Sequence, residues 1–372
     1  MKPAPEFAPY PAVQPPAYRR WLTAGIVSLV SLSSVGALLR PFPGQDLAVV
    51  ALLFATALSA LALLLRVLHY RFSHHTAQCY EASVQQVQQA WWSRHRQNAA
   101  LIDAVLLGPP CSRPEHRMRL FDPSRTAPTA QVTAKGLVLR VGQIFGTEFG
   151  ERERQLAKLL VVKWQEQSPQ LGPVRITHCY WQGSSQAWQA FVDQMWISFP
   201  QVRLPDEPVS WEGIRSFDSI IDVLQKAPSE SRILCAGCES SVARHDAVLP
   251  AGEAALLWLM AAKGGVRFFR GEWFEKGGEL LQAVAKRAMD QGALESSVAV
   301  CISFCDPAMS VAGTGWPIGP HRQGIYFGAL PGLGGMVAQT LAAWYAETYG
   351  EPCAWLADDA VHTLALGVVG TP

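Results

Sequence analysis

The sequence carries little charge, and this lack narrows the classes of partner that the protein can have. Of its 372 residues only 16% are Asp, Glu, Lys or Arg, and the formal net charge is +1. A protein without a basic field does not concentrate nucleic acid around itself. We therefore expect no nucleic acid among its partners.

Several common catalytic and metal-binding motifs are also missing. The chain has no GxSxG elbow, no GxxxxGK phosphate loop and no HExxH helix. These motifs place a nucleophile, cradle a phosphate or bind zinc, so their absence removes the most common hydrolase, nucleotide-binding and metalloprotease classes. We expect neither a cofactor nor a metal ion.

Cysteine is present, but its distribution does not suggest disulfide bonds. Eight cysteines are spread through a long chain, and we expect reduced, mostly buried thiols. Cys235 and Cys238 form a CxxC, and Cys301 and Cys305 form a CxxxC, which leaves a zinc site or a redox pair as alternatives. Both pairs lie in or at the end of apolar strands rather than on polar turns, which favours ordinary buried cysteines.

Two long uncharged runs lie near the N-terminus. Neither Trp21–Leu39 nor Leu47–Leu65 contains Asp, Glu, Lys, Arg or His. As a helix, each run would span about 28 Å, close to the thickness of a bilayer core. Between them, Arg40–Asp46 contains two prolines and a glycine, which favour a reversal of the chain. We predict a transmembrane helical hairpin over residues 19–71.

Basic residues flank the outer ends of this hairpin, whereas Arg40 is the one basic residue between the two runs. The positive-inside rule then puts both termini in the cytoplasm and predicts a multi-pass membrane protein in contact with lipid. A secretory signal peptide and a buried soluble hairpin are the alternatives. The flanking basic residues are Lys2, Arg19, Arg20, Arg66 and Arg71.

Two further segments differ from the rest in composition. Residues 1–18 contain six prolines, which predicts an extended or disordered cytoplasmic tail, with a docking peptide as the alternative. Residues 72–133 should hold a juxtamembrane helix over Thr76–Leu107, which lacks internal Pro and Gly, and then a proline-rich linker over Gly108–Pro128.

From about residue 134 to residue 372, strand-like and helix-like segments alternate. This alternation predicts an α/β fold with a largely buried sheet and a final antiparallel hairpin. The predicted strands are Gly136–Val141, Pro173–Trp181, Arg232–Gly237, the run that opens at Glu253, Ser297–Cys305, Pro352–Ala357 and Val361–Val369. The predicted helices are Glu151–Gln165, Ser184–Trp196, Ser216–Ala227, Gly278–Gly292 and Gly332–Gly350.

The order of these elements, with two short motifs, resembles the thiolase-like, β-ketoacyl synthase fold. In that family a Gly-Glu-(Gly/Ala)-Ala segment opens a buried strand, and Gly252 to Ala255 match it. The segment GLGGMVAQTLAAW resembles the small-residue turn that leads into a buried helix of the family. The resemblance implies a two-lobed α/β domain over residues 134–372.

The resemblance also implies where a catalytic site would lie. The family uses a Cys nucleophile at a strand-to-helix turn, with two His, or a His and an Asn, that polarise a thioester carbonyl. At that turn this chain offers Cys179 or Ser184, and a displaced His321 is the one histidine available. No second His precedes the small-residue turn. We therefore expect a non-catalytic domain, with acyl transfer by Cys179 and His321 as the alternative.

The Gly-rich segment and Glu253 have two interpretations each. Gly328–Gly335 could bind an anion at the start of the following helix, although close packing of strand and helix is favoured because no Lys, Arg, Ser or Thr accompanies it. Glu253 could be a catalytic acid or base. Without catalytic partners it is better interpreted as a residue that maintains the fold by accepting backbone N–H groups or pairing with a cation.

The overall layout resembles a proteobacterial family encoded with type VI secretion phospholipase effectors and implicated as effector adaptors. This resemblance implies a bacterial inner-membrane protein that binds a protein partner, such as a secreted effector. A homodimer and a purely structural membrane role are further possibilities. Tryptophan is favoured at the centre of protein interfaces, and the candidate anchors are Trp181, Trp188, Trp196, Trp211 and Trp316.

Overall fold

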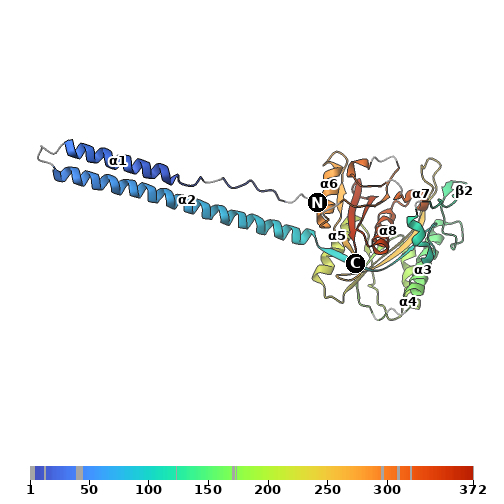
Figure 1. The fold of residues 1–372 in the computed structure, drawn as a ribbon. Helices are drawn as coiled ribbons and strands as arrows, with labels where there is room; N and C mark the ends of the chain where they lie inside the picture. The colour runs from blue at the N-terminus through green and yellow to red at the C-terminus, as the bar shows by residue number, and fades with distance from the viewer. Residues whose placement is uncertain are drawn as a thin grey trace. The chain divides into compact units, whose positions relative to one another are not determined.

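The computed structural model describes residues 5–11, 14–38, 45–122, 124–169, 172, 174–294, 297–307, 311–318 and 321–371 (Figure 1). The chain divides into two compact units, one spanning Ala4–Trp92 and the other containing Ser93–Pro372. The second unit therefore begins well before residue 134, the boundary expected for the α/β domain.

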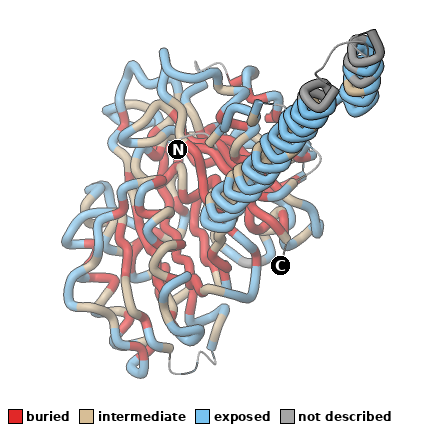
Figure 2. Tube along the Cα trace, turned by 90° about the vertical axis from the view of Figure 1, so that its left-hand side faces the viewer, coloured by how far each residue is buried: buried red, intermediate tan, exposed pale blue. Residues whose placement is uncertain are grey.

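The first unit contains the two helices expected of the hairpin. Helix α1 covers Tyr18–Leu38, and α2 covers Gln45–His95, a continuous helix of 51 residues. Among the described residues, Leu53–His95 is the one helical stretch that is long and apolar enough to cross a membrane by length and composition. None of its most apolar part is buried against protein, and α2 is largely exposed in Figure 2. Most of the predicted connection, residues 39–44, lies outside the described residues.

The proline-rich tail forms neither helix nor strand over residues 5–11 and 14–17, and its last residue, Tyr18, begins α1. It lies along α2 beyond the apolar part of that helix. The Tyr80 hydroxyl donates to the Ala8 carbonyl oxygen at 2.8 Å, and Arg66 donates to the Gln14 carbonyl oxygen at 3.4 Å. The rings of Tyr10 and Tyr80 are also in contact. The tail and the polar part of α2 therefore lie on the same side of the apolar segment.

The second unit is built on a ten-stranded sheet, counted over the described residues. Neighbouring strands follow the order β10-β11-β12-β8-β1-β7-β6-β4-β5, with β9 beside β12. Strand β4 is parallel to β5 and β6, and β10 is parallel to β11, whereas the other neighbours on this path are antiparallel. The strands are β1 (Asn98–Leu107), β4 (Ile176–Gln182), β5 (Val209–Ser210), β6 (Arg232–Ser240), β7 (Glu253–Ala261), β8 (Val266–Phe269), β9 (Glu272–Phe274), β10 (Cys301–Phe304), β11 (Cys353–Asp358) and β12 (Leu364–Gly370).

Helices pack on both faces of this sheet, and two of them lie between its two halves. Helices α3 and α4 pack on the outer face of β1, β7, β6 and β4, α6 packs on the outer face of β10 to β12, and α5 and α8 lie between the two halves. Strand β8 joins the halves, so the two expected lobes share one continuous sheet. The helices are α3 (Phe149–Gln167), α4 (Ser185–Ser198), α5 (Ile214–Lys226), α6 (Leu281–Gln291), α7 (Gly324–Phe327) and α8 (Gly334–Tyr349), and a separate hairpin pairs β2 (Gln131–Thr133) with β3 (Gly136–Val138).

Helix α8 is the centre of the core. It is apolar on nearly all sides because both halves of the sheet pack on it. Trp258 of β7 donates from its indole nitrogen to the Thr340 hydroxyl at 2.8 Å, so the one polar group of that fully buried indole is satisfied. In Figure 2 the buried residues are concentrated in the central strands and helix.

Most predicted elements are confirmed within a few residues, but the helix predicted over Thr76–Leu107 is wrong in its last third. Helix α2 ends at His95, and Asn98–Leu107 forms β1. The strand pairs with β7 on one side and with β8 on the other. Because Val105 and Leu107 face one helical layer while Ala104 and Leu106 face the other, burial on both sides outweighs the helix propensity of this Ala- and Leu-rich segment.

Glu253, the first residue of β7, is fully buried and has every oxygen satisfied. The guanidinium of the buried Arg152, on α3, donates to both carboxylate oxygens at 2.8 Å. The backbone N–H of Val141 donates to Oε2 at 2.7 Å, and the Ser240 hydroxyl donates to Oε1 at 2.9 Å. Arg152 also donates to the carbonyl oxygen of Ile144. The interpretation of Glu253 as a residue that maintains the fold is confirmed.

We expect Glu253→Ala to lower the free energy of unfolding by about 3–5 kcal/mol, because it leaves the Arg152 guanidinium buried without its partner. Denaturant unfolding of the full chain in detergent micelles, followed by circular dichroism, measures this loss. The matched control is Glu166→Ala, which removes an exposed carboxylate paired with Lys163 and should change stability little. Equal effects of the two substitutions would contradict the importance of the buried pair.

Candidate functional site

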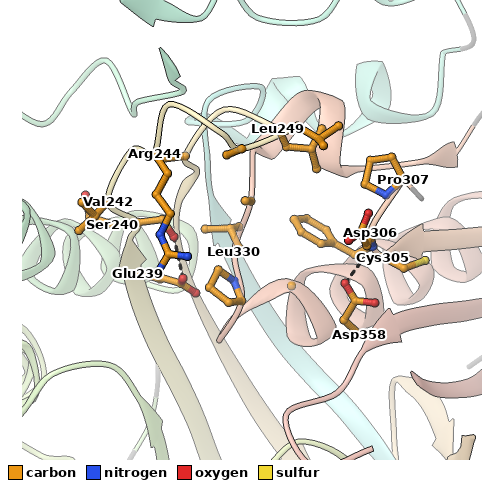
Figure 3. Close-up of a pocket in the computed structure, with 18 of the residues that line it drawn as sticks. Glu239, Ser240, Val242, Arg244, Leu249, Cys305, Asp306, Pro307, Leu330 and Asp358 are labelled. Carbon is orange, nitrogen blue, oxygen red and sulfur yellow. Dashed lines mark hydrogen bonds between the residues drawn. The ribbon is translucent and has the colours of Figure 1, made fainter. Parts of the chain in front are cut away.

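A cavity of about 700 Å³ opens where several chain segments of the α/β unit end. Its walls come from the start of α3, the segment from Glu239 to Ala251, the ends of β10 and β11, and the turn before α8. In Figure 3, Glu239 and Arg244 lie on one side, Cys305, Asp306 and Asp358 lie on the other, and Leu330 stands between them. A cavity of this size is typical of binding sites for small ligands or side chains.

The turn before α8 presents two backbone N–H groups to a single oxygen atom. The N–H groups of Gly332 and Leu333 donate to Oε2 of Glu239 at 3.0 and 2.9 Å. Two converging N–H groups at a helix N-terminus are the arrangement that binds anions and stabilises oxyanions in acyl-transfer enzymes. In this protein that position is occupied by a carboxylate of the chain itself. The Ser241 hydroxyl donates to the other oxygen at 2.7 Å.

Burial raises the pKa of Glu239, and the three hydrogen bonds that it accepts act in the opposite direction. The carboxyl group is therefore more easily protonated than an exposed glutamate. Across the cavity, the backbone N–H of Asp306 donates to Oδ2 of Asp358 at 2.9 Å. Partial burial also raises the pKa of Asp358.

The glycines of this turn serve close packing. A Cβ atom on Gly334 would lie 2.7 Å from the ring of Phe304, and one on Gly332 would collide with the Gln182 side chain. The interpretation of the Gly-rich segment as a packing device is therefore confirmed. The backbone N–H groups that the alternative, anion binding, requires are also present, but they donate to the Glu239 carboxylate.

Cys179 lies inside β4 rather than at the turn that follows it. Its side chain is fully buried against the α3 and α4 layer, and burial raises the pKa of its thiol to about 12. A thiol in such surroundings is not a thiolate at neutral pH. Ser184 caps α4, because its hydroxyl accepts the backbone N–H of Ala187 at 3.3 Å.

His321 lies in the segment between β10 and α7, beside Tyr345 of α8. Burial, and then the nearby Arg125 cation, lower the pKa of this imidazole. Cys179 faces the α3 and α4 layer, whereas Tyr345 packs with the central layer on the other face of the sheet. The structure therefore does not bring Cys179 and His321 together.

The two cysteines of the CxxC also point in different directions. On β6, Cys235 packs in the central layer, whereas Cys238 packs against α3 and α4. Two side chains on opposite faces of one strand cannot complete a tetrahedral site together. Cys301 belongs to the outer α6 layer. Six of the eight cysteines are buried and all eight are free, which confirms the expectation of mostly buried thiols.

Sequence reasoning did not identify the carboxylates of the cavity. Glu239 follows the buried Cys238 on β6, Asp358 ends β11, and Asp306 comes two residues after β10. The available signal was an acidic residue directly after an apolar strand, in CES, LAD and FCD. Ligand sites of α/β sheets gather at the carboxyl ends of strands.

No protein-family model matches the sequence, and no curated protein matches it. Solved structures do resemble the fold. The ishigamide ketosynthase/chain length factor is 11% identical with a TM-score of 0.50, over 74% of this chain and 99% of that one. ChlB3, described as an acyltransferase, is 12% identical with a TM-score of 0.48, over 74% and 97%. OleA of Xanthomonas campestris with acetamide bound is 12% identical with a TM-score of 0.40, over 74% and 99%.

At such identities the likeness shows the fold alone. The α/β unit has the thiolase-like fold of the ketosynthase/chain length factor, as the order of its elements and its two short motifs predicted.

The pKa of Glu239 leads to a prediction with a definite sign. A carboxyl group whose pKa is higher in the folded than in the unfolded protein costs stability once it ionises, and this cost is absent below the unfolded pKa. We therefore expect wild type to lose stability relative to Glu239→Gln as pH rises from about 4 to neutrality, the lower limit being the usual range of a glutamate. Denaturant unfolding at several pH values measures the difference.

The control for this series is Glu166→Gln, at an exposed carboxylate that lies outside the cavity. A trend with pH that is seen for Glu239→Gln and not for this variant assigns the change to the cavity carboxylate. If wild type gained stability over Glu239→Gln with rising pH, the hydrogen bonds rather than burial would determine the pKa of Glu239.

Proposed function

We propose that this protein is a membrane-anchored, thiolase-like adaptor that captures a partner protein and does not catalyse acyl transfer. The observation that carries this proposal is the occupation of the Gly332 and Leu333 N–H groups by Glu239. An acyl-transfer enzyme needs such groups free to receive the oxyanion of its intermediate. A binding protein can use them to hold its own structure.

The positions of the candidate catalytic residues support the same proposal. Nucleophilic catalysis needs a thiolate within hydrogen-bond reach of a base. Cys179 is buried within a strand, and His321 belongs to a different layer of the unit. Because Cys179 and His321 do not form a nucleophile and base pair, we favour binding at the cavity with its apolar rim as the role of the α/β unit.

We assign the first unit to a transmembrane hairpin in a bacterial inner membrane, with both termini in the cytoplasm. Its support is the length of the two uncharged runs and the basic residues outside them. The contacts of Tyr80 with Ala8 and of Arg66 with Gln14 support this proposal, because the tail lies beside the polar part of α2.

The partner that we favour is a secreted lipase effector of a type VI system, the role implied by the overall layout of the chain. Of the five candidate tryptophans, Trp196 is exposed over 71% of its surface, and the other four are buried. The neighbouring Ile197 is equally exposed. Exposed apolar side chains are typical of surfaces that bind other proteins.

The second candidate function is a membrane-bound acyl-transfer enzyme that uses Cys179. The observation in its favour is that the fold resembles that of proteins described as a ketosynthase and an acyltransferase. For this function, β4 would have to release Cys179 to solvent and Glu239 would have to leave the N–H groups. The two functions are therefore separable by experiment.

We expect no acyl adduct on Cys179 when the full chain in lipid nanodiscs is incubated with acyl thioesters, because the thiol is buried and protonated. Intact-protein and peptide mass spectrometry test this. The exposed Cys79 serves as an internal measure of background acylation. A thioester adduct that is lost in Cys179→Ala would overturn the non-catalytic proposal.

The adaptor role is tested in the same cells that make the protein. A photo-crosslinking residue in place of Val248, at the cavity rim, should give a product that contains a secreted lipase. The same residue in place of the exposed Lys263 should give none. Absence of any product from the Val248 position would count against the adaptor.

The hairpin predicts the side of the membrane on which each terminus lies. Green fluorescent protein fused to either end should fluoresce, and alkaline phosphatase fused to either end should be inactive, because both ends stay in the cytoplasm. Phosphatase activity at one end would show that the chain crosses the membrane an odd number of times.

A further inference from the structure

The cavity carries more negative than positive side chains. One guanidinium, that of the exposed Arg244, lies on its lining. Across the described part of the chain, no ion pair reaches Glu153, Glu239 or Asp358. The carboxylate residues of the lining are Glu153, Glu239, Asp306 and Asp358.

These carboxylates come from different parts of the chain and converge on one space. Glu153 lies on α3, Glu239 on β6 and Asp358 at the end of β11. Figure 3 places Glu239 and Asp358 on opposite sides of the cavity. Partly desolvated carboxylates that form no ion pair are electrostatically unfavourable, as the raised pKa values of Glu239 and Asp358 reflect. A cation between them would be favourable to both sides.

The remaining wall of the cavity is apolar. Leu249, Ala251, Phe304, Ala329 and Leu330 line it, and the carboxylates are set among them. A ligand that complements this wall carries an apolar group next to its positive charge. Apolar side chains joined to a few well-placed polar groups are the usual composition of such sites.

The apolar surface continues outside the cavity. At the mouth, the side chains of Phe149, Val242 and Val248 are exposed over 49%, 48% and 79% of their surfaces. Beside the mouth, β3 lies against Ala251, since the Ala251 N–H donates to the Leu137 carbonyl oxygen and the Leu139 N–H donates to that of Ala251.

The exposed apolar side chains of this bordering region are Val132, Leu137 and Phe145. A small molecule that filled the cavity would leave them, and those at the mouth, in water. A polypeptide segment would cover the cavity and its rim together.

We propose that the cavity receives a segment of the partner protein that inserts a lysine or arginine side chain beside an apolar one. The cation lies among Glu153, Glu239 and Asp358, and the apolar side chain packs against Phe304 and Leu330. The exposed side chains at the mouth cover the flanking residues of the segment. This proposal rests on the adaptor function and specifies the chemistry of the captured segment.

The probe is a fluorescein-labelled peptide, Ser-Gly-Ser-Leu-Lys-Phe-Ser-Gly-Ser, with two matched peptides in which norleucine or Glu replaces the Lys. Fluorescence anisotropy is measured with the full chain in nanodiscs of neutral lipid, so that the Lys is not attracted to the bilayer. We expect the Lys peptide to bind at least about 10-fold more tightly than the norleucine peptide, and the Glu peptide to bind most weakly.

Two double variants locate the binding. Glu153→Gln with Asp358→Asn keeps the size of the side chains and removes two cavity charges, and it should weaken the Lys peptide at least about 5-fold while leaving the norleucine peptide unchanged. The control, Glu166→Gln with Asp193→Asn, removes two carboxylates outside the cavity lining and should have no effect. The circular dichroism spectrum of each variant verifies that it folds.

The peptide-binding results test the requirement for a cation separately from the adaptor function. Equal affinity for the Lys, norleucine and Glu peptides, or no binding of any of them, would overturn the requirement for a cation. Equal loss in the cavity variant and the control would show that general surface charge is responsible, and it would also overturn the proposal. Neither result affects the adaptor function, which depends on the crosslink from position 248 and on the absence of acyl transfer.

Discussion

The buried ion pair between Glu253 and Arg152 holds together three chain segments on one side of the cavity of the α/β unit. Burial of two charges is favourable only when every hydrogen-bonding position is filled, and here backbone and hydroxyl groups complete the set. Arg152 adjoins Glu153, and Ser240 adjoins Glu239, so the pair positions two cavity carboxylates through their chain neighbours. One interaction thus joins the start of α3, the end of β6 and the start of β7.

On the same side of the molecule, a carboxylate of the chain occupies the backbone N–H groups that precede α8. The N-terminus of α8 attracts an anion through its N–H groups, and Glu239 supplies that anion from within the chain. The arrangement stabilises the turn, but it leaves no position for the oxygen of a substrate. A carboxylate that holds the helix start in place therefore works against catalysis and is compatible with binding.

Sequence patterns correctly predicted the elements whose structure is determined mainly by their own residues. Apolar runs predicted β6, β7, β11 and β12, and the position of Glu253 at a strand entrance predicted its structural role. They failed at β1, because Asn98–Leu107 is compatible with either helix or strand until its pairing with β7, at partners 148 to 161 residues further along the chain, is known. The cavity was unpredictable for a similar reason, since Glu239 and Asp358 meet only after the sheet has formed. The separation of Cys179 from His321 likewise becomes known only from the sheet. Cys179 faces the α3 and α4 layer, whereas His321 lies beside Tyr345, which packs on the other face.

Core and cavity share residues such as Phe304 and Leu330 but draw mostly on different parts of the chain. Helix α8 and the two half-sheets supply the packing, whereas the cavity is made by strand ends and by the segment from Glu239 to Ala251. Stability in such a fold depends on the layers, and function depends on the residues at their edge. Substitutions at Val248, Glu153 or Asp358 should therefore change binding with little effect on folding, because these side chains are partly exposed. Substitutions at Arg152 or Glu253 should affect both, because this buried pair is joined to the cavity lining: Arg152 adjoins Glu153 in the chain, and Glu253 accepts a hydrogen bond from Ser240.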